Sequence, residues 1–290
     1  MATGLTQSLA LLISAIAHAC WDNILVWMVH HDADASLLHM LWLRMMFMAL
    51  CLTIIAAFSP PTTHTFSARW WLTFSVIGWV IPTCTYSMSV LWTGYRLSLS
   101  FQPFIPLVVA LRTRSKFGTR ECFSLLLTMV ATWILWSTVT WKHEFWKVWS
   151  ALLASIVHAA CLVEWFVMLN EIPESPIPYM ARAAQLGVFL MFSITIVWTP
   201  QHLAGVFVYE TNTWLAIVIA AAVASSCKYW MVANFTRTMT PAAVAIFECV
   251  HPIATLCSDI VRGNDRLESQ DALAITLYAI GWILYPKHNT

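Results

Sequence analysis

The chain has 290 residues, of which 60% are hydrophobic and only 10% charged, and its mean hydropathy is +0.71. This composition excludes an ordinary soluble domain, because such domains carry about 25% charged residues. The 15 basic and 14 acidic residues nearly cancel, so the chain shows no polybasic signal for nucleic acid or anionic lipid. We therefore expect an integral, multi-pass membrane protein.

The first half of the chain contains five apolar segments separated by polar turns. Most are close to the roughly 20 residues that an α-helix needs to cross a bilayer. In chain order they are 5–27, 38–58, 70–92, 97–111 and 121–141. The loop after the fourth segment is basic, and this favours cytoplasmic termini. The sequence does not indicate which cellular membrane the protein occupies.

A comparable series fills the second half of the chain. Its segments are about 148–169, 178–198, 214–233, 241–261 and 271–285. The sequence thus predicts an all-α integral membrane protein of about ten transmembrane helices. We place the boundary between its two five-helix halves after residue 145, giving repeats at 1–145 and 146–290.

Polar and proline landmarks recur in the same order in both halves, which supports an internal repeat. The matched pairs are His18 with His158, Arg44 with Arg182, Pro106 with Pro252, and Trp136 with Trp282. Because each half holds an odd number of helices, the second half must enter the membrane from the opposite side. Inverted repeats of this kind are a recurring device for alternating access, with the site near the bilayer midplane.

The segment 241–261 carries a polar stripe within an apolar helix. Its members follow one another at spacings of three and four, which places them on one helical face. They are Glu248, His251, Thr255, Asp259 and Arg262. Pro252 lies inside the same segment and favours a local bend, because proline has no backbone N–H. A stripe of this type usually lines a protein interior or a water-filled path.

The last two segments resemble the final helix pair of the EamA-type carriers of the drug/metabolite transporter superfamily. The shared features are a small-residue start, a central proline, a charged turn after a glycine, and a closing helix that ends G-W-I-L. The family usually has a glycine–glutamate pair at the turn, where this chain has Gly263, Asn264 and Asp265. The resemblance covers nearly the whole chain and implies the same five-plus-five inverted arrangement.

Ionisable residues deep in a span cost about 2.5–3.5 kcal/mol each, so each needs a reason. Glu248 and His251 could bind substrate or exchange a proton, because burial favours the protonated carboxyl; alternatively they form a structural pair. Lys228 with Tyr229 could hold a carboxylate or phosphate, but Lys228 could equally pair with Glu248 or extend to an interface. His18 could flank a central cavity or be hydrogen-bonded in the packing.

The remaining ionisable candidates favour structural roles. Arg44 and Arg182 are better explained as ion-paired or interfacial anchors than as ligand contacts. Asp22 and Glu164 lie near loop ends, where water can reach them. The substrate-binding set that we predict is Glu248, His251, Lys228, Tyr229, Tyr86, His18 and His158. No catalytic, metal-binding or cofactor-binding motif is evident.

These observations lead to a secondary transporter as the expected function. It would move a small polar metabolite by alternating access, and a zwitterion such as an amino acid would suit a cavity offering both Lys228 and Glu248. Proton coupling is left open, and the protein could be a monomer or a homodimer in the lipid bilayer. Two alternatives are a membrane haem protein with histidine axial ligands and a carrier-like scaffold or sensor that does not transport. An enzyme is not expected.

Overall fold

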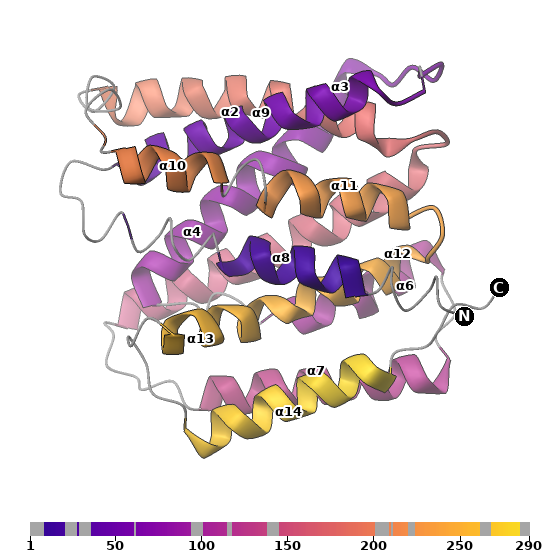
Figure 1. The fold of residues 1–290 in the computed structure, drawn as a ribbon, viewed down its shortest axis with the longest axis vertical. Coiled ribbons are helices and arrows are strands. Elements are labelled where there is room, and N and C mark those ends of the chain that lie inside the picture. The colour runs from indigo at the N-terminus through magenta and orange to yellow at the C-terminus, as the bar shows by residue number, and fades with distance from the viewer. Residues whose placement is uncertain are drawn as a thin grey trace.

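The computed structural model describes residues 9–20, 28, 36–60, 62–93, 101–114, 118–137, 145–200, 209, 211–219, 224–261 and 268–284. Every regular element within these ranges is helical (Figure 1), which confirms the all-α prediction. Asp22 and Arg262 fall outside the described residues, as do the side chains of Thr255 and Asp259.

Among the described residues, three helices are both long enough and apolar enough to cross a membrane. They are α2 (Leu37–Ala57), α8 (Phe145–Glu171) and α9 (Pro176–Trp198), and two shorter apolar helices are Leu9–Cys20 and Pro241–Val250. The structure therefore supports a membrane protein with several spans. The count of ten spans stays a prediction, although each of the ten expected ranges contains helix.

The other helices are shorter or interrupted. In the first half they are α3 (Ala68–Ser75), a π-helical turn η1 (Val76–Val80), α4 (Ile81–Thr93), a 3-10 turn η2 (Gln102–Phe104), α6 (Ile105–Thr113) and α7 (Thr119–Ser137). In the second half they are α10 (Thr211–Ile219), α11 (Ser226–Phe235), α12 (Pro241–Ala245), a 3-10 turn η6 (Ile246–Val250), α13 (His251–Val261) and α14 (Ser269–Leu284).

The helices of the two halves pack against each other in pairs. The closest pairs are α2 with α9, α7 with α14, α4 with α8, and α6 with α12. In Figure 1, α2 and α9 form one edge of the molecule, and α7 and α14 form the opposite edge. Each pair joins one helix from residues 1–145 to one from 146–290, so the halves interleave and the site between them draws on both.

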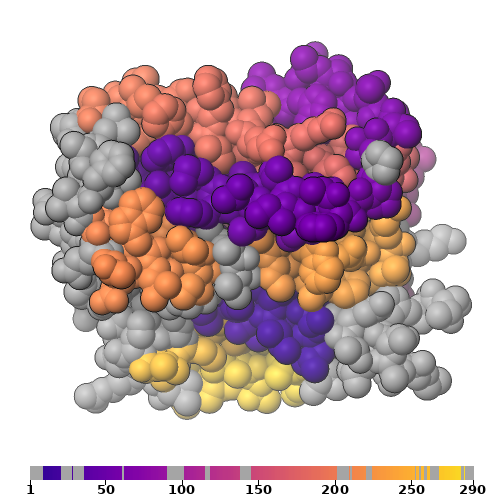
Figure 2. All heavy atoms as spheres, turned by 45° about the horizontal axis from the view of Figure 1, so that its top comes forward, coloured from indigo at the N-terminus to yellow at the C-terminus, as the bar shows by residue number. Residues whose placement is uncertain are grey.

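The helix Leu9–Cys20, which we call the N-terminal helix, presents two different faces. Leu11 and His18 are buried, whereas Leu9 and Ile13 are more than half exposed. Figure 2 shows this helix at the surface, between α11 and α14. An apolar outer face and a histidine on the inner face are what a helix between lipid and a polar interior requires.

Three helices lose regular α-helical hydrogen bonding just before a proline. The irregular turns η1, η2 and η6 precede Pro82, Pro106 and Pro252, respectively. Because proline has no N–H, the carbonyl four residues earlier loses its usual donor. The expected distortions at Pro106 and Pro252 therefore take the form of short 3-10 turns, and η1 before Pro82 is a third that we did not predict.

The π-helical turn η1 packs closely against Trp165 of α8 at Gly78. A Cβ atom at Gly78 would lie 2.6 Å from Cδ1 of Trp165, and Trp165 is only 1% exposed. We predict that Gly78→Ala lowers the melting temperature, because overpacking of this kind costs about 1–3 kcal/mol. Tryptophan-fluorescence melting in detergent would measure it.

Gly118→Ala is the matched control for this substitution. The added Cβ would meet only the end of the half-buried, flexible Glu121 side chain, so the melting temperature should stay near that of the wild type. Equal melting temperatures for the wild type and the Gly78 variant would contradict the close packing of η1 on α8.

Candidate functional site

All seven residues of the predicted set line one interior pocket. The cavity has a volume of about 40 Å³. Its walls are His18, Arg44, Pro82, Thr83, Tyr86, Ser87, Gln102, His158, Leu162, Lys228, Tyr229, Glu248 and His251. These residues come from the N-terminal helix, α2, α4, η2, α8, α11, η6 and α13. His18 and His251, which are 233 residues apart in the sequence, thus meet in one place, and the role of these residues in binding stays a prediction.

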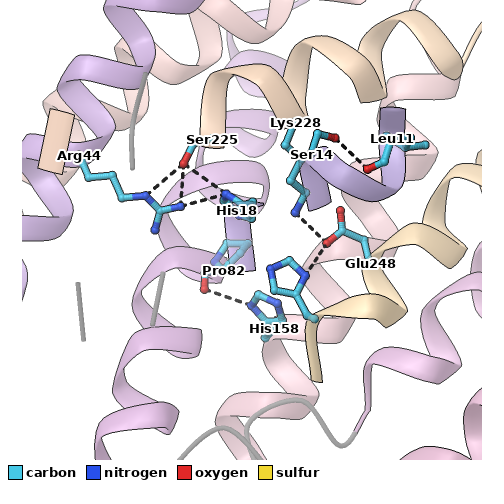
Figure 3. Close-up of polar contacts among 10 residues, drawn as sticks. Leu11, Ser14, His18, Arg44, Pro82, His158, Ser225, Lys228 and Glu248 are labelled. Carbon is cyan, nitrogen blue, oxygen red and sulfur yellow. Dashed lines mark hydrogen bonds and ion pairs between the residues drawn. The ribbon is translucent and has the colours of Figure 1, made fainter. Parts of the chain in front are cut away.

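A buried ion pair lies on one side of the pocket. Nζ of Lys228 donates to Oε2 of Glu248 at 2.8 Å (Figure 3), and their side chains are 5% and 3% exposed. Nδ1 of His251 lies 3.5 Å from the same oxygen. The cation at this distance favours the ionised carboxylate, which opposes the effect of burial. The idea that Lys228 and Glu248 are both available to a zwitterion is therefore wrong for this conformation, because they bind each other.

A second polar cluster joins α2 to the N-terminal helix. Nε and Nη2 of Arg44 donate to Oγ of Ser225 at 3.2 and 2.9 Å, and Nη2 lies 3.4 Å from Nδ1 of His18. Ser225 Oγ is itself 3.3 Å from that nitrogen. Because a guanidinium only donates, Nδ1 of His18 must accept. His18 is therefore a neutral imidazole with its proton on Nε2.

His158 has the opposite arrangement. Its Nδ1 lies 3.1 Å from the carbonyl oxygen of Pro82, and a carbonyl can only accept, so Nδ1 carries a proton. Figure 3 shows His158 beside Pro82, and His18 beside Ser225 and Arg44. The two residues matched by the repeat thus share the pocket but differ in tautomer and partner.

Aromatic rings form another part of the wall. The ring of Tyr229 lies 4.4 Å from that of Trp79 and 5.6 Å from that of Trp165, measured between centroids. Nζ of Lys228 lies 5.6 Å from the centroid of the Tyr229 ring. Tyr86 lies 5.7 Å from His158. These contacts fix the orientation of the polar residues, because the rings leave little room for other rotamers.

Arg44 and Gln102 are lining residues that the sequence analysis did not include in the site. Arg44 is buried and in the pocket, whereas its repeat partner Arg182 is exposed on α9. The predicted role of Arg44 as a structural anchor therefore describes only part of its environment, because Arg44 lines the cavity as well as bonding to Ser225. Gln102 gave a signal that was overlooked: it precedes Pro106 by four residues, as Glu248 precedes Pro252.

Glu164 lies outside the pocket. Its carboxylate receives two hydrogen bonds from Arg112, at 2.6 and 3.1 Å, and the side chains are 37% and 53% exposed. This pair is chemically similar to Lys228–Glu248 but solvated, so it provides a matched control. Among the described residues that line the pocket, Arg44 and Lys228 are cationic and Glu248 is anionic. The two cations and one anion leave one surplus positive charge when the histidines are not counted.

A larger groove, of about 470 Å³, lies elsewhere and is almost entirely apolar. It is lined by Phe101, Pro103, Phe104, Leu126, Met129, Val130, Thr132, Trp133, Trp136 and Leu152. The Thr132 hydroxyl is bonded to Tyr278. None of the described residues that line this groove is charged, so the smaller pocket is the better candidate site.

Comparisons with known proteins establish the fold alone. No family model matches the chain, and no curated protein matches it. A solved structure titled only "Crystal structure of protein" matches with a TM-score of 0.70 over 98% of this chain and 100% of that chain, at 13% identity. This likeness shows a shared helical fold and carries no statement of function. No cluster of metal-ligating side chains is found among the described residues.

The buried pair predicts a distinctive pattern of stability. Lys228→Met should destabilise the protein by about 3–5 kcal/mol, because it leaves a buried carboxylate without its cation. The double variant Lys228→Met/Glu248→Leu should recover most of that loss, since no charge remains to be compensated. Tryptophan-fluorescence melting of the single and double variants would measure the coupling.

The exposed pair serves as the control. Glu164→Gln should change stability by about 0–1 kcal/mol, as expected for a solvated ion pair. Additive effects of the Lys228 and Glu248 substitutions would contradict a direct buried contact between the two side chains.

Proposed function

We propose that this protein is a secondary transporter that moves a small polar metabolite across a membrane, as the resemblance to the EamA-type carriers implies. The observation that carries the proposal is the interior pocket, in which buried ionisable side chains from both halves converge. Each such group is costly in an apolar helix. Six of them meet here: His18, Arg44, His158, Lys228, Glu248 and His251.

The size of the cavity supports an alternating cycle rather than an open pore. A volume of about 40 Å³ is close to that of a single water molecule, about 30 Å³. Ligand pockets usually measure about 300–1,000 Å³, so a metabolite can enter only if the surrounding helices move apart. The described conformation is then a contracted state of the carrier.

The pairing of helices supports the inverted-repeat interpretation. If the halves 1–145 and 146–290 are related by a two-fold axis, equivalent helices can pack on each other across that axis. The pairs α2 with α9, α6 with α12, and α7 with α14 fit this expectation. Sites at such interfaces are typical of alternating-access carriers.

The haem alternative finds no support in the pocket. A porphyrin is far larger than a 40 Å³ cavity. Nδ1 of His18, which is its unprotonated nitrogen, already contacts Arg44. No specific observation favours the scaffold alternative, so transport is the function that we carry forward.

Flux measurements in proteoliposomes would test the proposal. We expect purified wild type to transport at least one member of a panel of radiolabelled carboxylates, amino acids and phosphates. Glu248→Gln should lower that flux by more than tenfold, because it changes the charge balance of the pocket, whereas Glu164→Gln should leave it near the wild-type rate.

Melting curves would confirm that both variants are folded. An absence of flux for every solute from well-folded wild-type protein would contradict the transporter proposal. Equal flux in the wild type and the Glu248→Gln variant would remove Glu248 from the mechanism.

A further inference from the structure

The pocket contains a buried acceptor that has no partner among the described residues. Gln102 is 2% exposed and lines the cavity, and its Oε1 atom has no hydrogen bond within the described part of the chain. Buried polar atoms are nearly always paired, and an exception calls for an explanation. A ligand that supplies the missing donor is one such explanation.

The local backbone places Gln102 and Glu248 in equivalent positions. The N–H of Ile105 donates to the carbonyl of Gln102, and the N–H of His251 donates to the carbonyl of Glu248. Both are 3-10 bonds, and each replaces the bond that the following proline, Pro106 or Pro252, cannot make. The same arrangement, a 3-10 turn that ends just before a proline, therefore occurs once in each half.

The two 3-10 turns also touch. Residues of η2 and η6 pack together, and Sγ of Cys249 donates to the carbonyl oxygen of Gln102 at 3.7 Å. Gln102 and Glu248 thus lie on contacting turns and line the same cavity. The two side chains differ in their hydrogen bonding, because the Glu248 carboxylate already accepts a hydrogen bond from Lys228.

We infer that Gln102 is a specificity-determining residue of the transport site, where its amide oxygen accepts a hydrogen bond from the solute. The one surplus positive charge of the lining groups matches a single carboxylate better than a phosphate monoester, which carries about −1.5 to −2. The substrate class is therefore a small monocarboxylate that bears an N–H or O–H donor. This inference rests on the transporter proposed above.

A buried acceptor selects against solutes that have no hydrogen-bond donor, because such a solute leaves the acceptor unpaired. A solute with a methyl group in place of the donor would fill the same space but leave Oε1 of Gln102 without a hydrogen bond, and such sites reject the analogue strongly. Lactate and isobutyrate are a suitable pair of probes, because a hydroxyl in one replaces a methyl in the other at equal charge. Alanine supplies an ammonium at the same position.

The experiment measures binding of these three probes by their shift of the tryptophan-fluorescence melting curve. In wild type we expect lactate and alanine each to bind at least tenfold more tightly than isobutyrate. Gln102→Met should remove this preference, because methionine has a similar shape and no strong acceptor. Gln185→Met is the control: Gln185 is an exposed amide on α9 that donates to Thr53, and its loss should leave the preference intact.

Gln102→Glu keeps an acceptor oxygen at the same reach but cancels the surplus positive charge, so lactate and isobutyrate should both bind more weakly while the preference for lactate remains. This provides a test even if the methionine variant does not fold. The inference is overturned if isobutyrate binds wild type as tightly as lactate and alanine, or if Gln102→Met leaves the preference unchanged. Loss of the preference in a folded Gln102→Glu variant would also overturn it. If none of the three probes binds while other solutes are transported, the substrate class is wrong and the transporter stands. If no solute is transported, both fail.

Discussion

The ion pair between Lys228 and Glu248 is the interaction on which the rest of the site depends. Each charge alone would be strongly unfavourable inside an apolar helical protein. Their attraction across 2.8 Å offsets that cost. The pair joins α11 to the break between α12 and α13, and His251 approaches the same carboxylate oxygen. Any solute that binds one member of this pair must compete with the other. The pair is therefore a natural point at which binding can be coupled to a change in conformation.

The proline-broken helices explain how this site can exist within tightly packed helices. A regular helix would hold the Glu248 carbonyl in an i→i+4 bond, but Pro252 cannot supply the donor. The chain instead tightens into η6, and Gln102 in η2 repeats the arrangement ahead of Pro106. Because these two turns touch, a small change in either one alters the shared cavity. In the proposed transport cycle they are suitable places for the two halves to bend.

Much of the site could be predicted from the sequence because its residues break an apolar pattern. Glu248, His251 and Lys228 stand out within their spans, and His18 and His158 recur in matched positions. Arg44 could not be placed in the same way, because its partner Ser225 is 181 residues distant and only the packing of α2 brings them together. The pairing of Lys228 with Glu248 is one of the three roles that the sequence leaves open for Lys228, since spacing along the chain does not determine contacts between helices. The number of spans cannot be counted from the lengths of apolar segments alone, because one segment can contain short interrupted helices such as α12 and α13.

The most direct test of the account is whether the pocket can be reached by water from both sides of the membrane. Ser87 lines the pocket and is 2% exposed, and cysteine is close to serine in size. In a protein whose eight native cysteines are replaced by alanine, Ser87→Cys can be labelled in sealed vesicles with a membrane-impermeant maleimide from either side. The account predicts slow labelling from both sides, with a lower rate when a transported solute is present. Labelling that occurs only after denaturation would contradict a cavity that opens alternately.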